Sequence, residues 1–134
     1  MGCFERVYSA QHMRENPRQS VRRLTIEIEN SRYAYPQIDF GMDVWVRGHH
    51  QIWRAGGQCE AVGGEWHCRP DTDGAPKLIF KAAGKGLRAI NPKSLQIFDD
   101  QTGPDLNSRH LRPPGDGAFM LQTVAIAVCR TERE

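Results

Sequence analysis

The segment Cys59-Glu-Ala-Val-Gly-Gly-Glu-Trp-His-Cys68 contains the clearest signal for the fold. Gly63-Gly64 is typical of a two-residue β-hairpin turn, because such a turn needs the positive φ angles that glycine adopts easily. Counting outward from the turn places Cys59 opposite Cys68 at a non-hydrogen-bonded pair, where Cα atoms lie about 4.5 Å apart. A disulfide spans that distance. The segment therefore predicts a β-hairpin closed by a Cys59–Cys68 bridge.

Two further cysteines lie near the ends of the chain. Four cysteines allow three pairings, and the hairpin leaves Cys3 to pair with Cys129. Cys129 ends a predicted last strand that begins at Phe119. A Cys3–Cys129 bridge closes a loop of almost the whole chain and requires the first and last strands to be close. Paired cysteines in a small chain indicate an oxidising compartment.

Zinc is the competing interpretation of the cysteines. Cys59, His67 and Cys68, with His49 or His50, offer enough thiol and imidazole ligands for one ion. The spacing is not Cys-x2-Cys, however, and in a strand His67 points to the opposite face from Cys68. We therefore favour disulfides and predict no metal site and no cofactor.

Segments on both sides of the hairpin alternate between apolar and polar residues, the pattern of half-buried β-strands. The clearest apolar face consists of Ile38, Phe40, Met42, Val44 and Val46. Thirteen glycines and eight prolines indicate many turns. A short N-terminal helix is expected from Ala10 to Glu15, after Ser9. We predict one all-β domain, residues 1–134, with about eight antiparallel strands in a small closed or nearly closed barrel. A two-sheet β-sandwich is the alternative.

The composition excludes some classes of protein. A net charge of +2 over 134 residues is too small to indicate nucleic-acid binding. The chain has no run of about 18 apolar residues, so we expect no membrane span. It opens Met1-Gly2-Cys3 without a signal peptide, and we expect a mature protein whose leader has been replaced. With the paired cysteines, this indicates a periplasmic or secreted protein.

One candidate binding surface combines a tryptophan with histidines. Trp45 interrupts the polar face of its strand, and an exposed tryptophan there would mark a binding surface; the alternative is that the long loop or the short helix covers it. His49-His50 follows the same strand in a turn. His110 lies in a long loop, residues 99–117, of a length that is often functional. We predict that Trp45, His49, His50 and His110 form one surface.

A second pattern is a basic stretch. No acid occurs between Asp73 and Asp99, whereas five basic residues do: Lys77, Lys81, Lys85, Arg88 and Lys93. Such a patch suits an anionic partner. The alternative, which we favour, is an edge hairpin that lysines keep soluble.

The opening Cys3-Phe-Glu-Arg-Val-Tyr-Ser-Ala-Gln-His-Met-Arg-Glu-Asn-Pro-Arg-Gln-Ser-Val21 resembles a group of uncharacterised small secreted proteobacterial proteins with paired cysteines. Their mature chains begin with Cys, Tyr and a His, continue with His-Pro-x-Gln, and end near a last Cys. Asn16 stands here where a second histidine is expected. The resemblance covers about the first 30 residues and the cysteine placement. It implies a periplasmic setting and no known activity.

These observations favour a non-enzymatic module that binds a protein or a small ligand, for instance an inhibitor or a carrier. The first alternative is a metal-binding protein that uses histidines and the loop carboxylates of Asp99, Asp100 and Asp105. The second is a hydrolase without a recognisable motif, and we assign no catalytic residue. Whether the barrel interior is hollow or filled would help to distinguish a hydrolase from a binding module.

Overall fold

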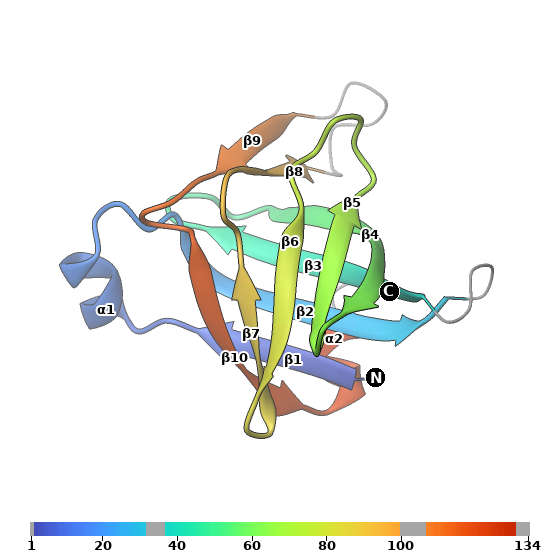
Figure 1. Cartoon of the computed structure of the whole chain (residues 1–134). Helices are drawn as coiled ribbons and strands as arrows, with labels where there is room; N and C mark the ends of the chain where they lie inside the picture. The colour runs from blue at the N-terminus through green and yellow to red at the C-terminus, as the bar shows by residue number, and fades with distance from the viewer. Residues whose placement is uncertain (1, 32–36, 100–106, 131–134) are drawn as a thin grey trace.

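The computed structural model describes residues 2–31, 37–99 and 107–130. These residues form ten strands and two short helices (Figure 1). In chain order they are β1 (Gly2–Val7), α1 (Ala10–Glu15), β2 (Val21–Asn30), β3 (Ile38–Val46), β4 (Ile52–Val62), β5 (Glu65–Pro70), β6 (Leu78–Ala83), β7 (Gly86–Ile90), β8 (Leu95–Asp99), β9 (Ser108–Leu111), β10 (Ala118–Val124) and α2 (Ile126–Arg130). Neither described helix has the length or the apolar composition to cross a bilayer.

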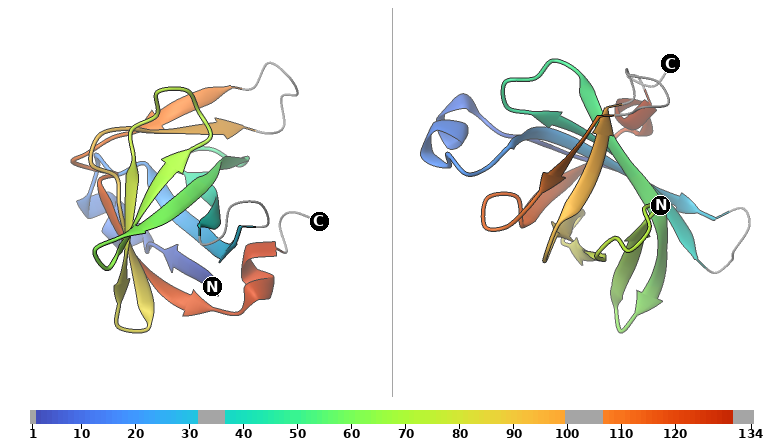
Figure 2. Two further views of the ribbon diagram at one scale, coloured as in Figure 1. Left: turned by 45° about the vertical axis from the view of Figure 1, so that its right-hand side comes forward. Right: turned by 90° about the horizontal axis from the view of Figure 1, so that it is seen from above.

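Eight of the strands close into an antiparallel barrel. Strands β1 to β7 follow one another around the wall, and β10 pairs with both β7 and β1. The β3–β4 pairing completes the ring. This confirms the predicted all-β barrel and not the β-sandwich. Strands β8 and β9 form a hairpin that attaches to β4 and lies across one end of the barrel (Figures 1 and 2).

The cysteine hairpin forms as its sequence predicts. Gly63 and Gly64 both have positive φ angles, 57° and 83°, in the turn between β4 and β5. The register places Cys59 opposite Cys68, and the two residues form a disulfide with a Cα–Cα distance of 4.0 Å. Both cysteines are buried within the core. Trp66 lies on the same face as Cys68 and packs against that core.

The barrel interior is filled with side chains. The predicted apolar face of β3 is buried, and Phe40 meets Phe80 edge to face with 5.4 Å between the ring centroids. Among the side chains around Met42 and Phe119, a void of about 10 Å³ remains, roughly the space of one water molecule. Leu95, Ile97 and Leu111 of the β8–β9 hairpin belong to the same core. The hairpin therefore covers that end of the barrel with apolar side chains.

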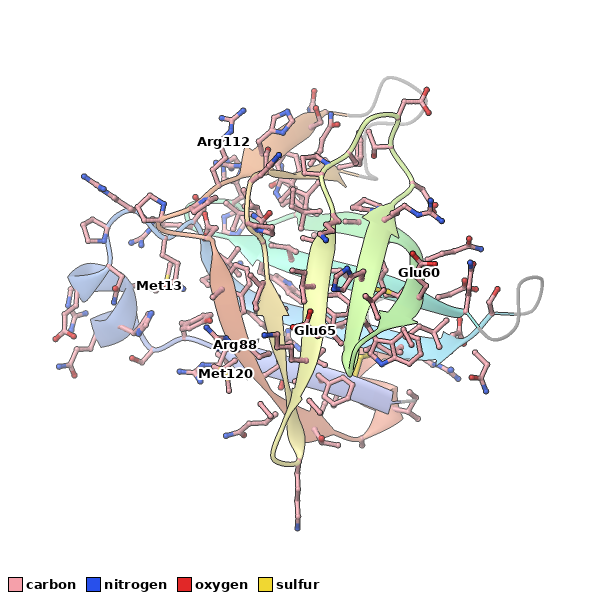
Figure 3. The ribbon with its side chains drawn as sticks, viewed as in Figure 1. Met13, Glu60, Glu65, Arg88, Arg112 and Met120 are labelled. Atoms are coloured by element: carbon pink, nitrogen blue, oxygen red, sulfur yellow. A yellow bond between two sulfur atoms is a disulfide. The ribbon has the colours of Figure 1, made fainter. Side chains whose placement is uncertain are left out.

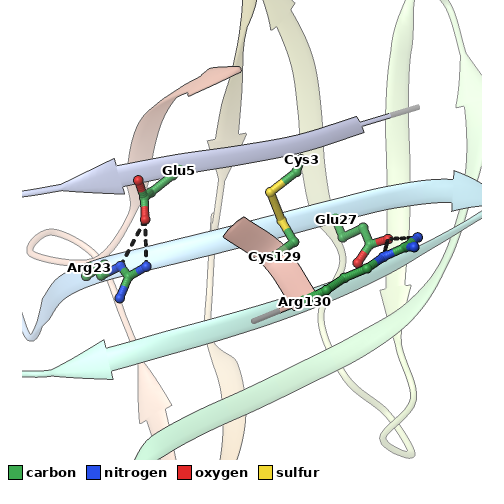
Figure 4. Close-up of a disulfide and its surroundings, with 6 residues drawn as sticks. All are labelled: Cys3, Glu5, Arg23, Glu27, Cys129 and Arg130. Carbon is green, nitrogen blue, oxygen red and sulfur yellow. Dashed lines mark hydrogen bonds and ion pairs between the residues drawn. A yellow bond between two sulfur atoms is a disulfide. The ribbon is translucent and has the colours of Figure 1, made fainter. Parts of the chain in front are cut away.

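The predicted last strand was wrong at its end. Strand β10 stops at Val124, which pairs with Cys3. The chain then forms α2 from Ile126 to Arg130. Cys129 in α2 nevertheless forms the predicted disulfide with Cys3, with 5.9 Å between their Cα atoms (Figure 4). The bridge holds α2 against β1 and β2, on the outside of the barrel.

The predicted long loop was wrong in part. Residues 108–111 of the range 99–117 form strand β9, which pairs with β8, while residues 100–106 lie outside the described residues. A strand of four residues between proline-rich segments gives a weak alternation signal, which explains the error. Asp116 in the remaining loop is buried and accepts hydrogen bonds from the amides of Ser20 and Val21. This loop is therefore tied to the start of β2.

Helix α1 forms as predicted, after an N-cap at Ser9 whose hydroxyl accepts a hydrogen bond from the His12 amide. The guanidinium of Arg47 fixes the following segment. It donates to the carbonyl oxygens of Met13, Asn16 and Gln19 at 3.1, 3.0 and 2.7 Å. These bonds hold α1 at the same end of the barrel as the turn after β3.

Candidate functional site

Trp45 is covered, and it offers little surface to a partner. Its exposed fraction is 6%. The guanidinium of Arg23 lies 4.1 Å from the centroid of the Trp45 ring, in the range of a cation–π contact. Arg23 and Trp45 are register partners on β2 and β3, and Glu5 holds Arg23 through two hydrogen bonds (Figure 4). A cross-strand neighbour therefore covers the tryptophan, and neither the long loop nor the short helix is needed.

The three histidines of the predicted surface are not brought together. His49 lies against Trp53, and its Nε2 is 3.0 Å from Nη1 of Arg109. His50 is the exposed neighbour of His49. His110 follows Arg109 in β9 and so points to the opposite face of that strand. There its Nδ1 lies 3.0 Å from Oγ of Ser94. The predicted surface is thus divided by the β8–β9 hairpin.

The described residues give the metal and hydrolase alternatives little support. No group of three or more His, Cys, Asp or Glu side chains within residues 2–31, 37–99 and 107–130 lies close enough to hold a metal ion. Asp100 and Asp105, considered above as metal ligands, fall outside these ranges. Asp73 lines the same groove of about 150 Å³ as Ser94 and His110. Within the described part of the chain, Ser94 and His110 are hydrogen-bonded to each other, and Asp73 is bonded to neither.

The barrel wall has a seam between β1 and β10. Their ladder has three residue pairs and ends at Glu5–Gln122. Beyond this point β1 remains paired with β2 as far as Val7, and β10 remains paired with β7 from Ala118. The two strands therefore separate from each other while each keeps its other neighbour.

The two most exposed large apolar residues of the described chain lie on the two strands that diverge at this seam, Val7 on β1 and Met120 on β10. Extending the β1–β10 register by two residues places Val7 opposite Met120. Their exposed fractions are 60% and 47%. Both point outward, since they alternate with the inward positions of their strands. Exposed apolar side chains that cluster mark interaction sites more often than single ones do.

Three basic residues lie close to the seam. Arg6 lies in the seam, where its guanidinium donates to the Met120 carbonyl at 3.5 Å and lies 4.8 Å from the centre of the Tyr8 ring. Arg88 is the register partner of Met120 on β7, and Figure 3 shows the two on the same side of the barrel. Lys85 lies in the turn between β6 and β7. We call the surface of Arg6, Val7, Lys85, Arg88 and Met120 the seam surface.

A groove of about 490 Å³ lies beside Met120, and Val7 and Arg88 are outside its lining. Arg6, Lys85 and Met120 line it with neighbouring residues of β6, β7 and β10, and none of its lining residues is acidic. The nearest acid on β1 is Glu5, the register partner of Gln122, and it is ion-paired with Arg23 at 2.8 Å. The groove is therefore both basic and partly apolar.

The basic stretch divides into neutralised and free cations. Lys81 lies 2.7 Å from Glu65, and Lys77 contacts His67. Hydrogen bonds from Lys81, and then from His67, lower the pKa of Glu65, so this carboxylate stays charged and compensates Lys81. Lys85 and Arg88 have no ion-pair partner within the described residues. The favoured explanation of an edge hairpin was wrong, because β6 and β7 are paired on both sides within the closed ring.

Tyr8 follows β1 directly and gives the seam a spectroscopic probe. Burial raises the pKa of Tyr8; nearby Arg6 opposes the shift and Asp116 adds to it. We expect phenolate absorbance to show one tyrosine that ionises above the ordinary value of about 10, and Tyr8→Phe to remove that component. A raised folded pKa means that stability is kept below about pH 10 and lost as the pH rises through the folded value. Loss of a component at or below the ordinary value would contradict the burial of Tyr8.

Sequence reasoning missed the seam surface. Its residues come from three separate segments, and their proximity depends on the strand that closes the ring. The only signal in the sequence was the acid-free stretch that contains Lys85 and Arg88.

In comparisons with known proteins, no family model, curated protein or solved structure matches the chain.

Proposed function

We propose that this protein is a non-enzymatic binding module of an oxidising compartment, which contacts its partner through the outside of the barrel at the seam surface. The observation that carries the proposal is the filled interior. A void of about 10 Å³ among the core side chains leaves no room for a ligand, because small-molecule pockets usually measure about 300–1,000 Å³. The groove along the seam, at about 490 Å³, falls within that range.

Two disulfides support the location in the periplasm or outside the cell. Disulfides persist in oxidising compartments and are rare in the cytosol. Here both bridges are formed, and all four cysteines are buried. The N-terminal resemblance to small secreted proteobacterial proteins is in agreement with this location.

A small anionic apolar dye tests whether the outside or the inside of the barrel binds ligands. We expect anilinonaphthalene sulfonate to shift the backbone amide NMR signals of Arg6, Val7 and Met120, since the groove there is basic and partly apolar. The signals of Phe80 and Ile97 in the core should not move. A Val7→Ser/Met120→Ser variant should lose most of the dye binding.

Val62→Ser is the matched control. Val62 is also exposed, with a fraction of 43%, but it lies at the β4–β5 turn, away from the seam. Equal loss of dye binding in this variant would show that any exposed apolar residue suffices. Shifts confined to the core residues would overturn the proposal, because the ligand would then enter the barrel.

A further inference from the structure

We infer that the seam surface recognises an acidic, extended segment of a partner protein whose apolar side chains alternate with carboxylates. This inference rests on the proposed function and names the chemistry of the partner. It depends on three features of the described residues: the exposed apolar pair, the uncompensated cations and the separated strand edges.

The apolar pair supplies the anchor. Val7 and Met120 expose 60% and 47% of their surfaces on the two diverging strands, and methionine adapts its shape to different apolar partners. A leucine or a similar side chain placed between them would bury apolar area on both strands, which is favourable in proportion to the area buried.

The cations select the charge of the partner. Arg6 and Lys85 line the groove with Met120, Arg88 is the register partner of Met120, and the groove has no acidic lining residue. Guanidinium groups bind carboxylates with two parallel hydrogen bonds. Arg88 is exposed and directly opposite Met120 in the register. A partner with a carboxylate next to an apolar side chain could therefore contact Arg88 and Met120 at the same time.

The separated strands favour an extended partner. From Ala118 to Leu121, β10 is paired with β7 and not with β1. One carbonyl of this edge, that of Met120, already takes a long hydrogen bond of 3.5 Å from Arg6. Sheet edges of this kind accept a peptide strand by main-chain hydrogen bonding, while alternate side chains give specificity. A segment with alternating apolar and acidic residues presents both sets at the spacing of a strand.

A polyanion fits less well. Three basic residues at the seam and a net charge of +2 for the chain are few for nucleic acid or a sulfated polysaccharide, whose binding depends on many simultaneous charge contacts. Neither ligand would use the apolar pair. An anionic lipid surface would not use the strand edge.

Capped peptides test this inference by NMR titration. We expect Glu-Leu-Glu-Leu-Glu to bind at the seam about tenfold more tightly than Lys-Leu-Lys-Leu-Lys, since two or more exposed charge contacts change sign between them. Glu-Ser-Glu-Ser-Glu should bind more weakly than the leucine peptide because it lacks the apolar anchor. Added salt should weaken binding of the acidic peptide.

Two variants test whether the acidic peptide binds at the seam or responds only to the overall charge of the protein. Arg88→Gln should weaken the acidic leucine peptide by up to about fivefold, the ratio that one exposed ion pair supports. Lys93→Gln is the matched control, because Lys93 is exposed in the turn after β7 and, unlike Arg88, is not a register partner of Met120; it should leave the affinity unchanged. Equal losses in both variants would contradict recognition at the seam.

Failure of this inference can be told from failure of the proposed function. If the dye maps to the seam but the two leucine peptides bind equally, the partner is not acidic and the binding module stands. Tighter binding of heparin or of phosphatidylglycerol vesicles than of the acidic peptide, at the same residues, would assign the seam to a polyanion or a lipid surface. If neither the dye nor any peptide contacts the seam, both proposals are wrong.

Discussion

Replacing Cys3 and Cys129 together by alanine is expected to lower the free energy of unfolding by about 5 kcal/mol. The two residues are 126 positions apart, and in the chain-entropy model the stabilisation grows with the length of the closed loop. The same model gives about 3 kcal/mol for Cys59 and Cys68, which are nine positions apart. The total free energy of unfolding of a small domain is about 5–15 kcal/mol. Loss of the Cys3–Cys129 bridge therefore removes a large part of the stability.

Denaturant titration of both double variants under oxidising conditions measures this difference. The Cys59→Ala/Cys68→Ala variant is the internal control. It also removes one buried bridge, but that bridge closes only a short loop. The loss of the longer bridge should also free α2, whose remaining described ion pair joins Arg130 to Glu27 at 2.7 Å (Figure 4). A larger effect from the short bridge would show that local packing, and not loop closure, dominates.

The second large effect is expected at the centre of the barrel. Phe80→Ala should destabilise the protein by about 3–5 kcal/mol, the usual cost of emptying a phenylalanine site in a core. Phe80 is fully buried and contacts Phe40 edge to face. Because the interior has almost no free space, the surrounding side chains have little alternative packing with which to fill the new cavity.

Thermal or denaturant unfolding of Phe80→Ala should be compared with Phe98→Ala. Phe98 is only partly buried and lies on β8, outside the core, so its loss should cost less than half as much. Similar losses for both residues would mean that the barrel centre is looser than the structure shows.

Local patterns predicted most of the fold. Gly63-Gly64 determined the register that pairs Cys59 with Cys68, and the alternation from Ile38 to Val46 determined which face is buried. Both signals depend on neighbours in the chain. The end of β10 at Val124 was not predictable in this way, since its partner Cys3 lies on a strand that is distant in the sequence.

The candidate site was predicted less well. The sequence placed Trp45 correctly on the outer face but could not show that Arg23 covers it, because that contact needs the β2–β3 register. His49 and His110 are both near one end of the barrel, yet β9 puts them on opposite sides. The seam surface requires the closure of the ring, and no window of sequence contains Val7 and Met120 together.

The bridge between Cys3 and Cys129 also determines how the domain carries mechanical load. A pull applied to the two termini passes through the covalent sulfur link, whose Cα atoms are 5.9 Å apart, and not through the hydrogen bonds of the wall. The intervening barrel is therefore shielded from tension. If the two ends were attached to a surface or to a neighbouring domain, force between them would pass through the disulfide. It would not break the hydrogen bonds between β1 and β10.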